Sequence, residues 1–239
     1  MTEDVPKDPD ADLAAELAKL QGDVKKMKRR ENRNLRHARA HGFLDGVLAF
    51  LKPGDIVIDC GANVGEVSEQ LSATGAEVLA FEPDPYAFGK LQARFADAKN
   101  VKLFQKAVAA SDGTVQLRRA SNFDQNPDGG SVKSTIVSGG RGINESMDES
   151  IAVEQVNFVA LVKSLIAERG EIALIKMDIE GAELELLDAM DEAGVFASVR
   201  CTVVETHERK FKEMRPGFRD LRARFSEKYS HTHVNLDWI

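Results

Sequence analysis

The sequence predicts an α/β fold in which helices cover both faces of a mostly parallel sheet. From residue 53 onward, short apolar runs alternate with amphipathic stretches of helical period. The apolar runs are nearly continuous rather than alternating with polar residues, which is typical of strands buried on both sides of a parallel sheet. This order of segments indicates a doubly wound, Rossmann-like arrangement. A helical extension is expected before it, at the N-terminus.

Five apolar runs predict the strands of this sheet, at residues 56–60, 77–82, 101–108, 172–178 and 199–205. The amphipathic stretches among them predict helices at 65–73, 85–95 and 181–190. A terminal strand is expected in the sequence YSHTHVNLDWI, with His231 and His233 on one face. The segment 120–150 is rich in Gly, Ser, Asn and Asp and predicts no regular element. We expect it to be a lid or a substrate-selecting insertion.

The composition is that of a globular protein with a substantial core. Of its 239 residues, 43% are hydrophobic and 30% are charged. No apolar run is long enough to span a membrane, and the acidic N-terminus differs from a secretory signal. The two cysteines, Cys60 and Cys201, fall inside predicted strands and form neither a disulfide framework nor a zinc cluster. A cytoplasmic protein is therefore expected.

Charge divides the chain into two predicted domains, an N-terminal segment at 1–41 and a larger domain at 42–239. Residues 1–24 carry a net charge of −5, and residues 25–41 carry +7. The basic run is more typical of a solvated helix face than of a binding site, and the total of −7 disfavours nucleic acid as a partner. Docking to RNA, lipid or an acidic substrate remains the alternative.

The N-terminal segment predicts one long helix at 11–41, after an acidic tail. Its apolar residues recur at spacings of four and three, as in a short coiled coil: Leu13, Leu17, Leu20, Val24 and Met27. This stripe has two interpretations that the sequence leaves open. The helix either forms a homodimer or packs on its own domain.

The sharpest motif is GDIVIDCGANVGE, residues 54–66, where a strand passes through a glycine turn into a helix. Gly61 allows a tight turn, and Gly65 allows the helix start to approach a ligand closely. The next strand ends in Glu82, about twenty residues later, where a carboxylate can accept hydrogen bonds from ribose hydroxyls. The pattern predicts an adenosine-containing cofactor; a strand-to-helix turn without a ligand is the alternative.

The charges around this loop favour S-adenosylmethionine over NAD. A dinucleotide loop requires G-x-G-x-x-G, but Asn63 and Glu66 occupy the second and third glycine positions. Asp59 and Glu66 place negative charge on both sides of the turn, which would repel a pyrophosphate at the helix N-terminus. S-adenosylmethionine carries no phosphate, and its sulfonium and ammonium groups attract carboxylates.

Four strings resemble the FkbM family of class I methyltransferases: PGDIVIDCGANVGE, VLAFEPDPYAFGKLQ, KAVAASDG and LIKMDIEGAELELL. The resemblance covers roughly residues 50–205. It implies O-methylation of hydroxyl groups of sugars or polyketides, in small molecules and glycans. The chain departs from the family at Asn157, Phe158 and Val159, where a T-L-D stretch is common, and at Asp188 and Ala189, where a glycine is common.

The resemblance also implies which residues hold the cofactor. Those expected around its methionine part are Asp59, Gly61, Ala62, Asn63 and Gly65. Glu82 would hold the ribose, Pro83 and Asp84 would shape the adenosine edge, and Ala107 and Val108 would border the adenine. Asp178 would lie beside both the methionine part and the substrate.

Transfer of a methyl group to a hydroxyl gains from a positioned base, because the alcohol is a poor nucleophile until it loses its proton. The expected catalytic residues are Asp178, Glu180 and His207, with His207 as the general base because its ordinary pKa lies near neutrality. Structural alternatives are helix capping for Glu180 and a simple strand-end hydrogen bond for His207. Asp178, Glu205 and His207 could ligate a divalent cation, but no tight ligand spacing supports this, and no metal is expected.

Three functions follow from these patterns. The first is an S-adenosylmethionine-dependent O-methyltransferase acting on a hydroxyl of a sugar, glycan or secondary metabolite. The second is an RNA or protein methyltransferase that docks through 25–41. The third is a non-catalytic scaffold with a methyltransferase fold, since fold alone does not determine function.

Overall fold

The structure, a computed structural model, describes residues 9–238, with side chains described from residue 13 onward except at 14 and 15. The predicted acidic tail lies partly outside the described residues. The chain divides into two compact units, residues 1–44 and residues 45–239. Each is described below by itself.

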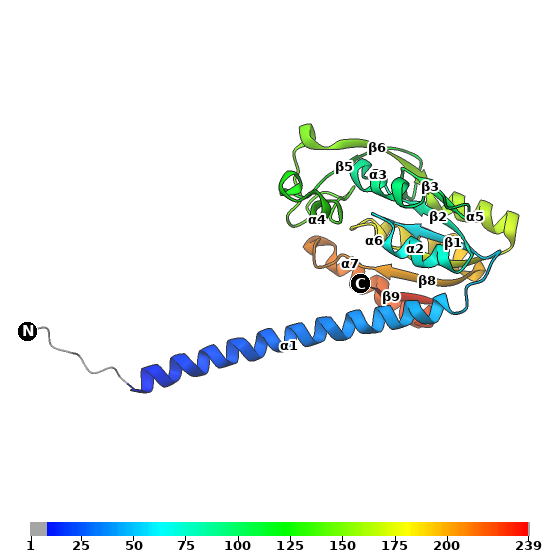
Figure 1. The fold of residues 1–239 in the computed structure, drawn as a ribbon. Coiled ribbons are helices and arrows are strands. Elements are labelled where there is room, and N and C mark those ends of the chain that lie inside the picture. Colours follow the sequence, from blue (N-terminus) through cyan, green and yellow to red (C-terminus); the bar gives the residue numbers. More distant parts are fainter. Residues whose placement is uncertain (1–8, 239) are drawn as a thin grey trace, which may run out of the picture. The chain divides into compact units, whose positions relative to one another are not determined.

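The first unit consists of a single long helix, α1 (Pro9–Leu48), whose last residues continue into the second unit (Figure 1). The prediction of one helix over 11–41 is confirmed, and the helix extends several residues further at its C-terminal end. The side chains of the predicted apolar stripe are exposed. Among the described residues, no helix combines the length and the apolar character needed to cross a lipid bilayer.

The second unit is built around a six-stranded sheet in which all neighbouring strands are parallel. The strands, in their order across the sheet, are β3 (Val101–Phe104), β2 (Glu77–Phe81), β1 (Ile56–Cys60), β7 (Ile172–Met177), β8 (Val199–Glu205) and β9 (Val234–Trp238). The order reverses between β1 and β7, and ligands of such sheets bind at the carboxyl ends of the strands at this point. The predicted doubly wound α/β fold is confirmed.

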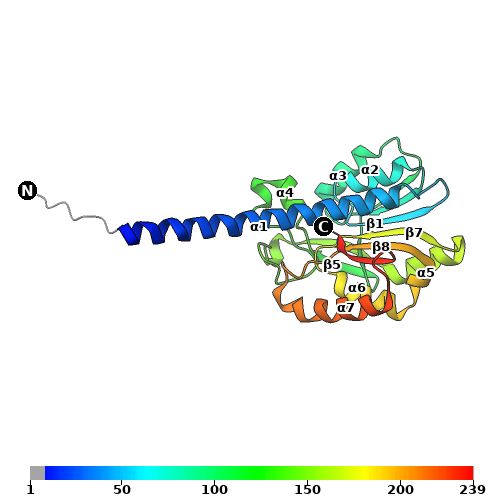
Figure 2. The ribbon, with the colours of Figure 1, turned by 90° about the horizontal axis from the view of Figure 1, so that it is seen from below.

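Helices cover both faces of this sheet, as the continuous apolar strands require (Figure 2). One face carries α2 (Glu66–Ala73) and α3 (Pro85–Arg94), and the other carries α5 (Phe158–Arg169), α6 (Glu183–Glu192) and α7 (Arg215–Lys228). The main core includes fully buried aromatic side chains, among them Phe81, Phe158, Phe196 and Phe218. This packing holds the carboxyl ends of the strands in fixed positions.

The single strand predicted at 101–108 is wrong, because the chain changes sheets at Gln105 and Lys106. Residues before this point pair with β2, whereas β4 (Ala107–Ala109) pairs with β6 (Ile151–Asn157). Together with β5 (Gly113–Leu117) these strands form a second sheet in the order β4-β6-β5. Its strands are short and partly exposed, so they lack the continuous apolar signal of the main sheet.

Two further expectations need correction. The segment 120–150 is not without regular elements, since it contains α4 (Pro127–Ser131) and the short 3₁₀ helices η1 (Phe123–Gln125) and η2 (Met147–Glu149). The terminal strand begins only at Val234, so His231 and His233 precede it. The ring of His233 instead bonds the main-chain carbonyls of Phe196 and Val199. The shared strand face predicted for the two histidines does not exist.

Gly61 allows the ends of β1 and β7 to approach each other. Its φ is +77°, and an added Cβ would lie 1.7 Å from the carbonyl oxygen of Asp178. That oxygen belongs to the main chain and cannot move aside without shifting β7. Any larger residue would therefore separate the two strand ends.

We predict that Gly61→Ala lowers the free energy of unfolding by about 3 kcal/mol or more, through steric overlap added to the strain of a positive φ. Gly54→Ala is the matched control, because Gly54 has a φ of +94° but no atom within 4 Å of an added Cβ. It should lose only about 1–2 kcal/mol. Equal losses in urea unfolding of the two variants would contradict the close approach described here.

Candidate active site

The loop at 61–65 uses its main-chain N–H groups internally. Gly61 and Ala62 both donate to the carbonyl of Phe81 at 2.9 Å, and Gly65 donates to the carbonyl of Ala62 at 2.8 Å. Asn63 donates to Glu82, and Val64 donates to the side chain of Asn63, both at 2.8 Å. A phosphate cradle requires main-chain N–H groups directed at the ligand. This loop has its five already bonded, which disfavours a dinucleotide independently of charge.

Gly65 has a packing role that differs from the expected one. Its φ is +88°, and an added Cβ would lie 2.6 Å from the ring of Phe95 and 2.7 Å from Leu91. The glycine therefore lets the start of α2 pack against α3. Gly65 does not line either of the two pockets that adjoin the loop.

The first of these pockets encloses about 580 Å³ of space, part of it open to solvent, at the carboxyl ends of the central strands. Its lining includes predicted residues that follow β1, β2 and β7 and two that lie in β4: Gly61, Asn63, Glu82, Pro83, Asp178, Ala107 and Val108. The segment 131–136 of the insertion also contributes to its lining, so the insertion does adjoin the predicted site.

Glu82 is the buried acid of this pocket. Its two carboxylate oxygens accept hydrogen bonds from the N–H groups of Asn63 and Asp84, each at 2.8 Å. Burial raises the pKa of Glu82 to about 7, although these two hydrogen bonds oppose the shift. Each carboxylate oxygen retains a second lone pair, so the group can still accept hydrogen bonds from a ligand.

Asp84 is placed differently from the prediction and does not line the pocket. Its fully buried carboxylate caps the N-terminus of α3 through the N–H of Tyr86, and it accepts a bidentate pair from Arg119 at 2.6 and 3.0 Å. Ser134 donates to it as well, at 2.7 Å. Asp84 therefore fastens both sides of the insertion to the end of β2, rather than contacting an adenosine directly.

Asp59 is also turned away from the pocket. It is fully buried at the end of β1, where it accepts a hydrogen bond from Ser68 at 2.6 Å and lies 3.1 Å from the ammonium group of Lys176. Lys176 donates to the carbonyl of Gly61 at 2.8 Å. Burial alone would lower the pKa of Lys176, but the charges of Asp59 and Asp178 outweigh it and raise the pKa. Lys176 thus links Asp59 to the loop at 61–65 and holds the start of this loop in place.

A second pocket adjoins the first, and Gly61, Asn63, Val132 and Asp178 line both. Ala62, which was expected near the methionine part of the cofactor, lines only this second pocket. Its walls also carry charge, from Glu66, Lys90, Arg94 and Lys176. The two pockets together could hold a cofactor and part of a second molecule.

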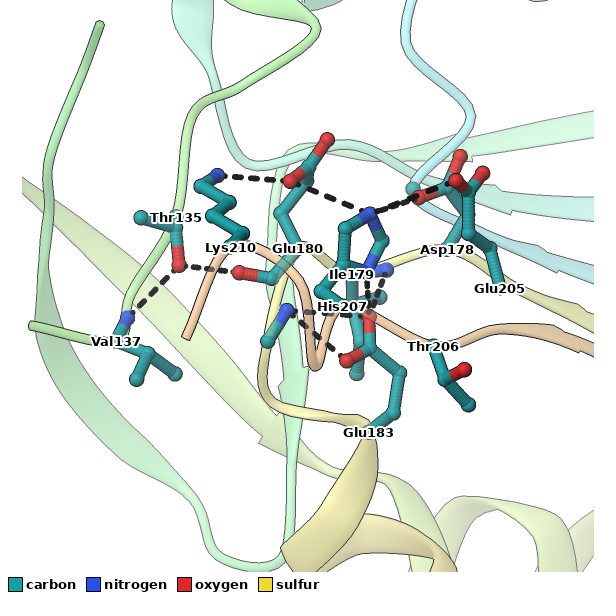
Figure 3. A network of polar contacts seen from close by, with 12 residues as sticks. Thr135, Val137, Asp178, Ile179, Glu180, Glu183, Glu205, Thr206, His207 and Lys210 are labelled. Carbon is teal, nitrogen blue, oxygen red and sulfur yellow. Dashed lines mark hydrogen bonds and ion pairs between the residues drawn. The ribbon is translucent and has the colours of Figure 1, made fainter. Parts of the chain in front are cut away.

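His207 lies at the centre of a cluster of carboxylates at the ends of β7 and β8 (Figure 3). Its Nδ1 is 2.9 Å from an oxygen of Glu183, and its Nε2 is 3.3 Å from an oxygen of Glu180. Asp178 and Glu205 lie slightly further from Nε2, at 3.7 and 3.9 Å. The structure thus brings together the three predicted catalytic residues.

These contacts give His207 a stable positive charge. Burial alone would lower its pKa, but the hydrogen bonds to Glu180 and Glu183 outweigh burial and raise the pKa to about 11. At neutral pH, the ring therefore carries both protons and cannot accept another. In this arrangement His207 orients carboxylates, which argues against the general-base role expected from its ordinary pKa.

The surrounding carboxylates differ in proton affinity. Burial raises the pKa of Glu205 to about 7, and the charge of Asp178 adds to this effect. Burial likewise raises the pKa of Asp178, against the charges of Lys176 and His207. In Glu180 burial is outweighed by His207 and Lys210, which hold its pKa below the ordinary value. Glu205 thus has a pKa suited to accepting a proton near neutral pH.

Glu183 and Glu180 shape the turn between β7 and α6. Glu183 is fully buried and accepts hydrogen bonds from the N–H groups of Ile179 and Gly181, as a capping side chain does. Glu180 has a φ of +55°, unusual for a residue other than glycine. Its carboxylate accepts from Lys210 at 2.7 Å and its carbonyl accepts from Thr135 at 2.6 Å. Glu180 therefore fastens the insertion at the end of β7.

Sequence reasoning considered Glu205 only as a possible metal ligand and assigned no functional roles to Lys210, Thr135 or Arg119. Glu205 and His207 alternate on one strand end, which is the signal that indicated Glu205. The other three lie far along the chain from the carboxylates they contact, so no local pattern indicates them.

Asp178, Glu180 and His207 each direct one ligand atom into a space where these atoms lie within 4.8 Å of one another. This set differs from the one considered from sequence, since Glu180 replaces Glu205. A divalent cation there would have to displace the Nε2 proton of His207, which faces Glu180, while the Nδ1 proton could stay on the hydrogen bond to Glu183. The expectation that no metal is needed stays a prediction.

Comparison with known proteins decides the family. The sequence pattern of the family described as "Methyltransferase FkbM domain" matches residues 59–230. The chain belongs to this family. It is 30% identical over 179 residues to the 31-O-demethyl-FK506 methyltransferase FkbM of Streptomyces tacrolimicus. The matched region covers 66% of this chain and 67% of that protein. The resemblance noted from sequence motifs is confirmed.

Two further relatives of this FkbM-family enzyme are similar over comparable lengths. The methyltransferase sdnD of Sordaria araneosa is 31% identical over 182 residues, covering 67% of this chain and 70% of that protein. The hexuronic acid methyltransferase AglP of Haloferax volcanii is 27% identical over 157 residues, covering 64% of this chain and 56% of that protein. The chain is an S-adenosylmethionine-dependent methyltransferase, as the sequence predicts.

We predict that the stability of the enzyme falls as pH rises from about 6.5 towards 11, since the folded state holds the His207 proton over this range and the unfolded state does not. The slope of the free energy of unfolding should include up to about 1.4 kcal/mol per pH unit from this group. His207→Gln keeps hydrogen-bonding capacity without the titration and should flatten the slope. An unchanged slope in urea unfolding across this range would show that His207 is not held as a cation.

Proposed function

We propose that this enzyme transfers the methyl group of S-adenosylmethionine to a hydroxyl of a sugar, glycan or secondary metabolite. The observation that carries this proposal is the position of Asp178. Its side chain lines both pockets and also lies 3.7 Å from His207, in the carboxylate cluster. A cofactor site and a set of proton-accepting groups therefore meet at one residue.

The cofactor is proposed to occupy the first pocket with its adenosine part. Apolar walls from Phe81, Val108 and Leu117 suit an adenine ring, and Glu82 is available for the ribose hydroxyls. The loop at 61–63 would flank the methionine part. Asp59 and Asp84 support this site from behind instead of contacting the cofactor.

Charge supports the same choice of cofactor. The groups around the end of β7 include the carboxylates of Asp178, Glu180 and Glu205, only part of whose charge is balanced by His207 and Lys210. Carboxylates of this kind attract a sulfonium or an ammonium group, and the bonded N–H groups of the loop offer nothing to a phosphate.

S-adenosylmethionine, when bound, supplies an electrophilic methyl group. The chain's own residues would then hold an acceptor hydroxyl near Asp178 and remove its proton. We assign this proton to Glu205, because its pKa of about 7 lets it both accept and release a proton near neutrality. The hydroxyl oxygen forms the new bond to the methyl carbon as the sulfonium–methyl bond breaks. His207 keeps its protons and holds Glu180 and Asp178 in place.

The class of acceptor is supported by the relatives. Their names give a demethylated oxygen of FK506 and a hexuronic acid as the acceptors of two of them. Methylation of RNA or protein through the basic segment 25–41, and a non-catalytic scaffold role, stay as alternative predictions. A cytoplasmic location is supported by the two cysteines, which are buried and free.

Calorimetric titration with S-adenosylhomocysteine, with NAD in a parallel experiment, tests the cofactor assignment. We expect micromolar affinity for S-adenosylhomocysteine, none for NAD, and loss of binding in Glu82→Ala. The matched control is Glu168→Ala, which removes an exposed carboxylate on α5 that pairs with Arg169. Absence of binding to the folded protein would leave the scaffold function as the better account.

We predict that the affinity for S-adenosylhomocysteine falls about tenfold between pH 8 and pH 6, because protonation of Glu82 replaces one acceptor of the ribose by a donor. Glu82→Gln should bind more weakly than the wild type at pH 8 and show little change with pH. If the wild-type affinity stays constant over this range, Glu82 either does not contact the ligand or is not raised to a pKa of about 7.

We predict that Glu205→Gln lowers kcat by about a hundredfold or more with any hydroxyl acceptor found by screening, while the affinity for S-adenosylhomocysteine changes little. His207→Gln should lower kcat less and leave the acidic limb of the pH–rate profile in place. The opposite ranking, with loss of the acidic limb in His207→Gln alone, would restore His207 as the base.

A further inference from the structure

Helix α1 carries an exposed apolar stripe that the methyltransferase site does not use. The stripe consists of the side chains Leu13, Leu17, Leu20, Val24 and Met27, which are between 49% and 70% exposed. They recur at alternating spacings of four and three over two heptads, which places them along one line of the helix. Contiguous exposed apolar side chains of this kind mark interaction surfaces.

The charges along the same helix are strongly asymmetric. Residues 9–24 carry a net charge of −3, and residues 25–41 carry +7. Two such helices aligned in the same direction would place the two basic segments side by side and the two acidic segments side by side. Aligned in opposite directions about the middle of the stripe, near Leu20, the two stripes overlap fully. Residues 9–15, with a net charge of −2, then face residues 25–31 of the other copy, with a net charge of +4.

We propose that two copies of this chain associate through the stripe as an antiparallel coiled coil. The apolar side chains supply the contact, and the opposite charges of 9–15 and 25–31 select the orientation, as charged flanking positions do in coiled coils. The proposal does not depend on the identity of the methyl acceptor. It also pairs the first part of the basic segment within the dimer.

An RNA partner would account for the same features less well. Nucleic acid would neutralise the basic segment through its phosphates, but it would leave both the apolar stripe and the acidic segment without a partner. A second copy of the chain covers the stripe and also pairs the acidic residues 9–15 with the basic residues 25–31. The two occupants also differ in a measurable way, because only the dimer forms without added nucleic acid.

The first test is the molar mass of the full chain by sedimentation over about a hundredfold range of concentration. We expect a dimer for the wild type, a monomer for Leu17→Glu, and a dimer for Ala18→Glu. The last variant adds the same charge at a neighbouring exposed position off the stripe. Circular dichroism of each variant checks that the helix is retained. A wild-type monomer, association only on addition of a short RNA, or equal effects of the two variants would overturn the proposal.

The second test is orientation. A spin label on Arg36→Cys lies on the helix side opposite the stripe, and the two native cysteines are buried and protected from labelling. With a rise of about 1.5 Å per residue, the two labels of an antiparallel dimer should lie more than about 40 Å apart, against roughly 20 Å in a parallel one. A parallel dimer would overturn the assigned orientation.

Salt dependence provides an independent readout of the same orientation. Screening should weaken an antiparallel dimer, because it removes attraction between opposite charges. The same salt should strengthen a parallel dimer, because it removes repulsion between like charges. Association that increases with salt would therefore contradict the antiparallel arrangement.

Discussion

The buried ion pair between Asp59 and Lys176 is the contact on which the site depends. It joins the ends of β1 and β7, which are neighbours in the sheet, and Lys176 extends from it to the carbonyl of Gly61. Removing one partner would leave the other as an isolated buried charge, which typically costs about 3–5 kcal/mol. The pair also sets how closely the cofactor loop approaches Asp178. The contacts of Lys176 therefore hold the loop in place and also put a positive charge beside Asp178.

The carboxylates around His207 differ in pKa, because they differ in the charges next to them. His207 is held as a cation between Glu180 and Glu183, and together with Lys210 it balances these two buried carboxylates. Glu205 lies at the edge of the same cluster, with less compensation, and its pKa rises to about 7. A pKa near neutrality, which the sequence suggested for the imidazole, is thus found at a neighbouring carboxylate instead. Coupled groups of this kind are common at sites of proton transfer.

Local patterns were enough to predict the main sheet, the glycine turn after β1 and the position of Glu82 at the end of β2, because each depends on residues close together in sequence. A continuous apolar run indicates a strand that is buried on both faces. The glycine turn and Glu82, which follows it, lie within thirty residues of each other. The roles of Asp84 and His207 were not predictable in this way. Asp84 is occupied by Arg119 and Ser134, and His207 is charged by Glu183, through contacts between distant parts of the chain. The small sheet of β4, β5 and β6 also escaped prediction, since its short and partly exposed strands give no continuous apolar run.

The hydrogen bonds inside the loop at 61–65 determine which changes of ligand are open to this protein. Three of its N–H groups are bonded to main-chain carbonyls, those of Phe81 and Ala62, and no side-chain substitution would release them. Conversion to a nucleotide-phosphate site would therefore require a different path of the backbone. The pocket wall at 131–136 is held in two ways, by main-chain bonds such as the pair between Arg118 and Thr135, and by the side chains of Ser134 and Thr135. Ordinary substitutions can thus reshape this wall, while the preference against a phosphate-bearing ligand stays with the path of the main chain at 61–65.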